Sequence, residues 1–180
     1  MPSSPSPSPF EEYVVPELEV LSRVAYSITR NRADAEDLVQ DTLLRAYKAI
    51  DRFDGRYPRA WLLTIMRNAQ INRVRRKRPE LLRDPDTAME RLADTSSDAG
   101  TPEDAVVDLM FDAAVETAYN RLPPKFREVV ELVDLGGLAY QEASEILGVP
   151  IGTVMSRLHR ARGRLKKDIE AAGITPRRRA

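Results

Sequence analysis

The chain has 180 residues, with 28 basic and 28 acidic side chains and a formal net charge of zero, so its overall charge favours no particular partner. It contains no cysteine, which excludes disulfide bonds and thiolate metal sites and is typical of a reducing compartment. No apolar run approaches the roughly 20 residues that span a bilayer, and the N-terminal MPSSPSPSPF lacks the apolar core of a signal peptide. We therefore expect a cytoplasmic protein without membrane insertion, built as one medium or two small domains.

The charges are distributed unevenly along the chain. Arg56–Arg83 contains nine basic residues and one acidic residue, whereas Asp84–Glu116 contains ten acidic residues and one arginine. From Ile151 to the end, nine basic residues accompany only two acidic ones. Two basic segments that flank an acidic one indicate two separate contacts with a polyanion.

Helical periodicity dominates the first half of the chain. After a disordered Ser/Pro tail at residues 1–9, apolar residues at helical spacing predict a helix over Pro16–Thr29. Asp34 is the expected N-cap of the next helix, Ala35–Ile50. The predicted buried stripe of that helix is Ala35, Leu38, Val39, Thr42, Leu43, Ala46, Tyr47 and Ile50, and its opposite face carries Asp37, Gln40, Asp41, Leu44 and Lys48.

A third helix is predicted over Arg59–Arg78, after a loop that contains the helix breakers Gly55 and Pro58. It ends in Arg-Arg-Lys-Arg before Pro79. Cations at that position suit both the dipole of a helix C-terminus and a phosphate backbone, so both interpretations stay open. The predicted inner face is Trp61, Leu62, Ile65, Met66 and Ala69, and the outer face is Thr64, Arg67, Asn68, Ile71, Arg75 and Arg78.

The second half begins with an acidic linker. Its carboxylates fit a solvated spacer and equally an imitation of nucleic acid. Apolar spacing then predicts helices over Pro102–Arg121 and Lys125–Leu135. No segment alternates as a strand, so we predict an all-α protein of two small helical domains joined by a flexible linker.

The stretch from Leu138 to Leu165 predicts two helices joined by a tight turn. A short helix over Tyr140–Leu147 is followed by Gly148-Val149-Pro150 and a second helix from Ile151, with Gly and Pro as stop and start signals. One face of the second helix is apolar and the other is basic and hydroxylated. This pattern is typical of a helix-turn-helix whose second helix enters a DNA major groove, although an αα-hairpin with a solvated basic face has the same features. The apolar stripe is Ile151, Val154, Leu158, Ala161 and Leu165, and the opposite face is Thr153, Ser156, Arg157, Arg160 and Arg164.

Three motifs occur in an order that resembles the sigma-70 family of transcription initiation factors. DAEDLVQDTLLRAYKAIDRF (34–53) and RAWLLTIMRNAQINRVRRKR (59–78) resemble region 2, and LPPKFREVVELVDLGGLAYQEASEILGVPIGTVMSRLHRARGRL (122–165) resembles region 4. No region 3 lies between these motifs, and in this respect the chain resembles the extracytoplasmic-function (ECF, group IV) class. The resemblance covers about residues 10–170. It divides the chain into a tail (1–9), a region 2-like domain (10–79), an acidic linker (80–101), a region 4-like domain (102–170) and a basic tail (171–180).

The resemblance implies a role for each motif. In the family the DLVQ-type helix docks on the β and β′ subunits of core RNA polymerase, the third helix lies on the −10 element, and the helix-turn-helix reads the −35 element. The loop before the third helix, here Asp51–Tyr57, captures an unstacked base, and many such factors are held by an anti-sigma protein. The implied core-binding residues are Asp37, Leu38, Gln40, Asp41 and Leu44; the −10 residues are Arg67, Asn68, Asn72, Arg75 and Arg76; and the −35 residues are Thr153, Ser156, Arg157 and Arg160.

The residues alone are also compatible with two other classes of protein. A stand-alone helix-turn-helix regulator would use Leu138–Leu165 but would leave the Asp37/Leu44 face without a role. An enzyme could hold a divalent metal on Asp34, Asp37 and Asp41, which share one helical face. No second acidic helix, glycine-rich phosphate loop or nucleophile motif accompanies them, so we expect no enzyme and no cofactor. His159, the single histidine, lacks companions for a metal site.

Overall fold

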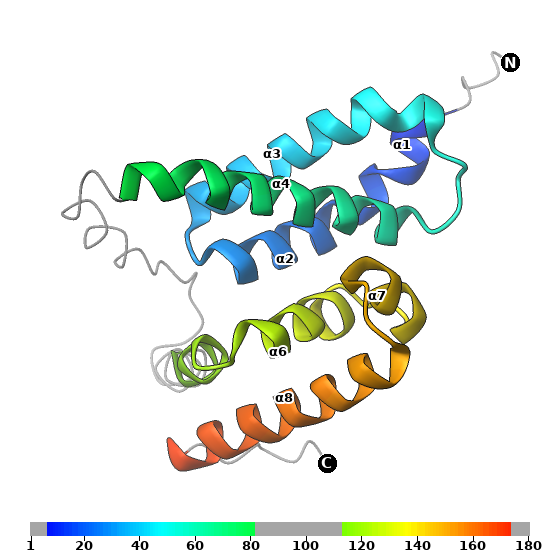
Figure 1. Cartoon of the computed structure of the whole chain (residues 1–180). Helices are drawn as coiled ribbons and strands as arrows, with labels where there is room; N and C mark the ends of the chain where they lie inside the picture. The colour runs from blue at the N-terminus through cyan, green and yellow to red at the C-terminus, as the bar shows by residue number, and fades with distance from the viewer. Residues whose placement is uncertain (1–6, 82–112, 174–180) are drawn as a thin grey trace, which may run out of the picture.

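The computed structural model describes residues 7–81 and 113–173, with side chains placed up to residue 76 in the first of these segments. Every regular element in these residues is a helix, which confirms the all-α prediction. The helices form two groups, α1–α4 and the helix over 113–120 with α6–α8, which lie one above the other in Figure 1. The acidic linker at 80–101 lies almost wholly outside the described residues, as do the first eleven residues of the predicted Pro102–Arg121 helix.

The first group begins earlier than the periodicity predicted, with a short helix that starts at the last residue of the predicted tail. The hydroxyl of Ser8 accepts a hydrogen bond from the Glu11 backbone, and the Glu11 carboxylate accepts one from the Ser8 backbone at 2.8 Å, which forms a capping box. The helix has only five residues, PFEEY, which is too short to show an apolar stripe, so the periodicity does not predict it. The first elements are α1 (Pro9–Tyr13), the 3-10 turn η1 (Val15–Glu17) and α2 (Leu18–Thr29).

Helix α3 (Arg32–Ala49) packs against α2 and contains two departures from prediction. Its N-cap is Asn31, whose side chain accepts a hydrogen bond from the Asp34 backbone at 2.9 Å, so Asp34 lies in the first turn instead of capping it. Tyr47 was predicted to be buried but is 66% exposed, because its ring lies at the rim of the bundle, edge-on against Phe10. A 3-10 turn, η2 (Ile50–Arg52), follows α3.

Helix α4 (Pro58–Leu81) completes the first group and buries Leu62, Met66 and Ala69 against α3. It continues through Pro79, three residues beyond the predicted end. Proline at 79 lacks the N–H that would pair with the Arg75 carbonyl, so the last turns of α4 have one backbone hydrogen bond fewer than a regular helix.

The second group is built around the helix-turn-helix, whose two helices have the predicted starts. Gly148 adopts φ +64 at the end of α7, where residues with a Cβ are strained. Val154, Leu158 and Ala161 are buried as predicted, but Ile151 at the start of the second helix is exposed. The elements are the helix over 113–120, α6 (Pro124–Val129), the π-helix η5 (Val130–Leu135), α7 (Tyr140–Leu147) and α8 (Ile151–Ala171).

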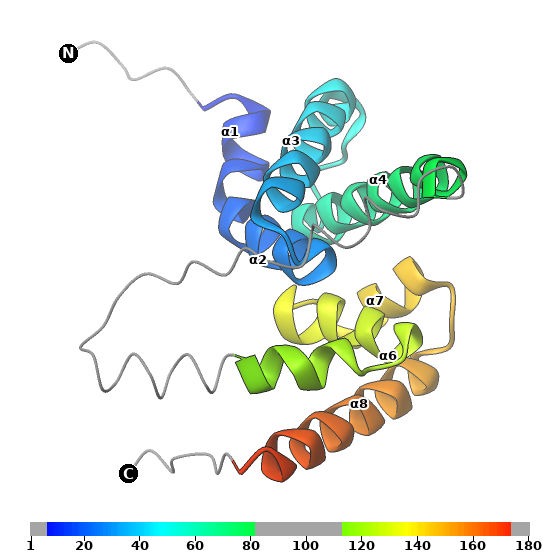
Figure 2. The ribbon, with the colours of Figure 1, turned by 90° about the vertical axis from the view of Figure 1, so that its left-hand side faces the viewer.

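The two groups pack against each other through α2 and α4 on one side and η5 and α7 on the other. Figure 2 shows α2 and α4 facing α6 and α7, with α8 on the far side of the second group. Leu63, one residue outside the predicted inner face of α4, is buried, and its Cδ1 would lie 2.8 Å from a Cβ at Gly136. Glycine at 136 therefore allows the two groups to approach closely.

Candidate nucleic-acid and polymerase interface

The outer face of α3 presents a mixed polar and apolar surface. Asp37, Gln40 and Leu44 are exposed, and Leu44 is 61% exposed although it is an aliphatic side chain. Leu38 is 0% exposed in the core, where it holds the helix in place, and its implied contact with core polymerase stays a prediction. An apolar side chain surrounded by acids and amides is a common arrangement at the centre of a protein interface.

Intrahelical and interhelical ion pairs hold the carboxylates of this face. Asp41 accepts a hydrogen bond from Arg45 Nε at 2.8 Å, and Asp37 lies 3.5 Å from Arg73 on α4. Beside them, Val39, Gln40 and Tyr26 line an open groove between α2 and α3. The face therefore offers partly neutralised carboxylates, an exposed leucine and an adjoining groove.

The basic face of α4 is divided between free and paired arginines. Arg75 and Arg76 are exposed and form no ion pair with any residue that the structure describes, and the two asparagines, Asn68 and Asn72, are also exposed. Arg67 differs, because its guanidinium lies 3.6 Å from the Glu128 carboxylate of the second group. The five predicted −10 residues thus lie along one helix, but one of them is engaged by the other half of the molecule.

The loop between η2 and α4 is held in a specific shape by its own residues. Asp54 accepts a hydrogen bond from the Arg56 backbone at 2.9 Å, and Gly55 adopts φ +78. Tyr57 also has a positive φ of 52, which is strained for a residue with a side chain, and is 69% exposed. An exposed aromatic ring on a strained loop suits stacking with a flat ligand.

Aromatic rings support this loop from beneath. Phe53 stacks on Trp61 with ring centroids 4.3 Å apart, and Tyr13 of α1 lies edge-on to Phe53 at 5.6 Å. Trp61, predicted as core, is only partly buried and acts as the floor of the loop. The contribution of Tyr13 was not predicted, because α1 itself carried no periodic signal.

On α8 the predicted −35 residues share the face opposite the buried stripe. Ser156 and Arg160 are exposed, while Thr153 and Arg157 are half-buried. Neither arginine forms an ion pair with a residue in the described part of the chain. Arg162 points elsewhere, since it donates two hydrogen bonds to Asp134, and this pairing raises the pKa of its guanidinium.

Residues 7–81 and 113–173 contain neither a cluster of metal ligands nor a membrane-spanning helix. No group of three or more His, Cys, Asp or Glu side chains in those segments is placed to hold a metal ion, and this includes the Asp34/Asp37/Asp41 face. No helix among the described residues is long and apolar enough to cross a membrane.

Two family profiles match the chain, sigma-70 region 2 over residues 15–80 and sigma-70 region 4 over residues 112–165. The chain therefore belongs to the sigma-70 family of RNA polymerase sigma factors. Its relatives place it more narrowly among the extracytoplasmic-function factors, a class of transcription initiation factors and not of enzymes. It is 36% identical over 152 residues to the ECF RNA polymerase sigma factor SigW of Bacillus subtilis, covering 82% of this chain and 81% of that protein. It is 33% identical over 169 residues to the RNA polymerase sigma-E factor of Streptomyces avermitilis, covering 93% and 89%.

Solved structures of similar proteins carry the same fold. The sigma factor RpoE, in a complex with the anti-sigma factor NepR from Bartonella quintana, matches with a TM-score of 0.73 and 31% identity over 89% of this chain and 96% of that one. CnrH, in a complex with the cytosolic domain of CnrY, matches with a TM-score of 0.63 and 28% identity over 90% and 88%. These matches extend across both helical groups.

Proposed function

We propose that this chain directs core RNA polymerase to specific promoters by contacting the −35 element through α8 and the −10 element through α4. The observation that carries the proposal is the arrangement of α8, in which a buried apolar stripe turns Arg157 and Arg160 outward without ion-pair partners in the described residues. Arginine in a major groove binds guanine edges with two hydrogen bonds, and hydroxyl side chains such as those of Thr153 and Ser156 accept several bases. We assign duplex reading to this helix.

The outer face of α3 is the surface we assign to the polymerase. Asp37, Gln40 and Asp41 supply carboxylate and amide groups for a basic helical partner, and Leu44 supplies the apolar centre. We assign this face to contact with the β and β′ subunits. A stand-alone regulator would have no use for an exposed leucine in an acidic face, so this face favours the polymerase-dependent function.

The loop at 51–57 is the place where we expect an unstacked base to be held. Tyr57 offers an exposed ring, and Arg52 and Arg56 form no ion pair with the residues that the structure describes. Stacking of a base on an aromatic ring contributes about 1–3 kcal/mol, which is comparable with the cost of unstacking one step of a duplex. The loop would therefore help to stabilise promoter DNA in its melted form.

We also infer a protein that restrains this factor. RpoE, which shares the fold, forms a complex with the anti-sigma factor NepR, and CnrH, which also shares it, forms one with the cytosolic domain of CnrY. An anti-sigma protein of the same kind is the partner we expect here. Because the chain would act at chromosomal promoters, we expect it in the cytoplasm. We expect it to have no catalytic activity and no cofactor of its own.

Run-off transcription with core polymerase on a library of genomic fragments tests the proposal. We expect the chain to start transcription at defined sites that share two sequence elements, and to bind core polymerase in a pull-down. A stand-alone regulator would instead bind its operator tightly without polymerase and start no transcripts. That result would overturn the proposed function.

A further inference from the structure

The short helix α1 packs against the turn that opens the loop at 51–57, at the end of the first group where this loop leaves α3 (Figure 1). The Tyr13 ring of α1 lies edge-on to Phe53 at 5.6 Å, and Phe53 stacks in turn on Trp61 of α4 at 4.3 Å. Edge-on and stacked ring pairs each contribute to stability beyond the apolar area that they bury. Three rings from three separate segments therefore form one continuous series that supports the loop.

Tyr13 also contacts the backbone of the loop at Gly55. A Cβ placed on Gly55 would lie 3.3 Å from the Tyr13 hydroxyl oxygen and 3.5 Å from the ring carbon that bears it. The phenol therefore lies directly against the glycine, and a larger residue at 55 would displace it. Because Gly55 has φ +78, glycine is needed both for the turn and for this close approach.

The loop needs such support because its backbone is strained at Tyr57. Tyr57 has φ 52, a value that residues with a Cβ rarely adopt, and it precedes Pro58, which favours extended backbone in the residue before it. A strained backbone persists only where its surroundings hold it in place. The Tyr57 carbonyl accepts a hydrogen bond from the Trp61 backbone at 3.1 Å, which is a local contact within the first turn of α4. Tyr13 instead ties the loop to a distant part of the sequence.

Helix α1 supports the loop from a fixed position, because it is held at both ends. At its start, the Glu11 carboxylate of the capping box also accepts a hydrogen bond from the Ser8 hydroxyl at 2.9 Å. At its end, the C-cap residue Val14 is 0% exposed. Between them, Phe10 lies edge-on to Tyr47 of α3 at 5.6 Å. The helix is therefore a fixed part of the first group although it has only five residues.

The aromatic series reaches the surface where a base would enter. Phe53, Tyr57 and Trp61 line the same open groove, and Tyr57 is 69% exposed. Tyr13 does not line this groove. It would therefore act on a bound base only through Phe53 and the backbone of the loop.

We propose that Tyr13 of α1 is a positioning residue for the base-capturing loop, and that the N-terminal helix thereby sets how well the chain stabilises melted promoter DNA. This inference rests on the proposed function for its effect on transcription, whereas the support of the loop by Tyr13 does not depend on that function. Without the ring, the loop leaves its strained conformation and Tyr57 loses its fixed position. A preorganised loop binds a base more tightly, because less entropy is lost when the complex forms.

The first measurement uses Trp61, which is the only tryptophan of the chain and reports on the loop support without an added label. In Tyr13→Ala we expect Trp61 fluorescence to become about twofold more accessible to quenching by acrylamide, because Phe53 loses its edge contact and the stack loosens. Tyr13→Phe keeps the ring and should stay close to the wild type. If Tyr13→Ala fails to fold, Tyr13→Leu gives the same reading, since leucine covers the core but offers no aromatic edge.

The second measurement separates positioning of the loop from a general loss of stability. On a duplex promoter, Tyr13→Ala should lower the yield of melted complex about tenfold, as the loss of one base stack does. Permanganate reactivity of the unpaired thymines measures this yield. On a template whose −10 region is already unpaired by mismatches, saturating holoenzyme should start transcription equally with the wild type and the variant. Affinity for core polymerase and for −35 duplex DNA should not change.

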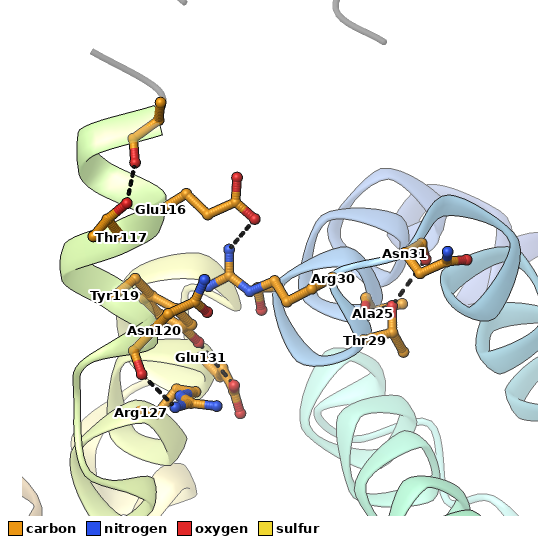
Figure 3. Close-up of polar contacts among 12 residues, drawn as sticks. Ala25, Thr29, Arg30, Asn31, Glu116, Thr117, Tyr119, Asn120, Arg127 and Glu131 are labelled. Atoms are coloured by element: carbon orange, nitrogen blue, oxygen red, sulfur yellow. Dashed lines mark hydrogen bonds and ion pairs between the residues drawn. The ribbon is translucent and has the colours of Figure 1, made fainter. Parts of the chain in front are cut away.

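Thr29→Val is the matched control, at the opposite end of α2 from α1. The Thr29 hydroxyl donates hydrogen bonds to the carbonyls of Ala25 and Asn31 at 2.9 and 3.1 Å (Figure 3). The adjoining Arg30 faces the second group, where its guanidinium carbon lies 4.2 Å from the Tyr119 ring centroid. This control removes polar contacts from the first group without touching the loop. It should lower the unfolding temperature and leave the quenching and the yield of melted complex as in the wild type.

Three outcomes would overturn the proposal. They are unchanged quenching of Trp61 in Tyr13→Ala, an equal loss of melted complex in Thr29→Val, and a defect of the same size on the mismatched template. If the wild type starts no transcript on any template, the proposed function fails, while the quenching still decides whether Tyr13 holds the loop.

Discussion

The arginines of α4 and of α8 occupy different surroundings, although both helices carry basic faces predicted to contact DNA. On α8, Arg157 and Arg160 have no ion-pair partner in the described residues. On α4, Arg67 is paired with Glu128 of the second group and Arg73 with Asp37 of α3, whereas Arg75 and Arg76 have no ion-pair partner in the described residues. The positions of the helices explain the difference, since α8 lies on the outer side of the molecule and α4 at the junction between the groups (Figure 1).

The contrast shows that two helices with similar basic residues can differ in how available those residues are to DNA. A helix on the outside presents its cations to any polyanion, whereas a helix at a junction shares its cations with neighbouring carboxylates. An arginine already paired gains less from a phosphate, because the existing pair must break first. We therefore expect α8 substitutions to weaken promoter recognition more than the substitution of Arg67.

The largest effect is expected from Arg157→Ala combined with Arg160→Ala. Each arginine that binds a base edge with two hydrogen bonds contributes about 1–3 kcal/mol, so promoter-specific transcription should fall about 100-fold or more. Affinity for core polymerase should stay unchanged in a competition assay. Arg162→Ala is the control on the same helix, because Arg162 is held by Asp134, and an equal loss in that variant would contradict the assignment.

The next effect concerns the polymerase face. Leu44→Ala should weaken binding to core polymerase about tenfold, as expected for an apolar residue at the centre of an interface. The unfolding temperature should hardly change, because Leu44 is largely exposed. Asp37→Ala with Gln40→Ala should act in the same direction.

The neighbouring leucine provides the control for that experiment. Leu43 packs against the core, so Leu43→Ala should lower the unfolding temperature and leave the affinity of the folded chain for polymerase intact. If the Leu44 variant competed for core polymerase as well as the wild type does, α3 would not be the docking face.

A smaller effect separates paired from free arginines on α4. Arg75→Ala should reduce promoter binding severalfold and lower the slope of log affinity against log salt by about one, as the loss of a phosphate contact does. Arg67→Ala should cost less, because Arg67 is already paired with Glu128 and gains less from a phosphate. Titration of promoter fragments at several salt concentrations measures both, and a larger loss for Arg67 would reverse the comparison.

The smallest effect is a dependence of stability on pH. Burial raises the pKa of Glu131, although Tyr119, Arg127 and Arg30 oppose the shift and Glu128 adds to it. A carboxyl whose pKa is raised by folding favours the folded state when protonated, and this stabilisation is lost as pH rises through the raised pKa. Glu131→Gln keeps an acceptor for the Tyr119 hydroxyl. We therefore expect this variant to unfold at a higher temperature than the wild type at pH 7, and at the same temperature as the wild type at about pH 4. A difference that does not change with pH would contradict the role of burial.

The sequence predicted the elements that depend on nearby residues. The boundaries of α7 and the start of α8 followed from Gly148 and Pro150, and Val154 and Leu158 followed from helical spacing. These features involve residues within a few positions of one another, so a linear pattern contains them. The cap of α3 was wrong by three residues, because Asn31 and Asp34 are both good N-caps and only the surrounding packing selects one.

The tertiary structure alone decided which faces meet. Nothing in the spacing of α4 showed that Leu63 would be buried by a second domain, that Arg67 would pair with Glu128, or that Arg30 would reach Tyr119. The partners in these contacts are separated by more than 60 residues, and a contact at that distance depends on how whole domains are placed. The sequence determined which helices form and what chemistry each carries, and domain packing determined which of those surfaces are free, because local propensity acts within a helix and burial acts between helices.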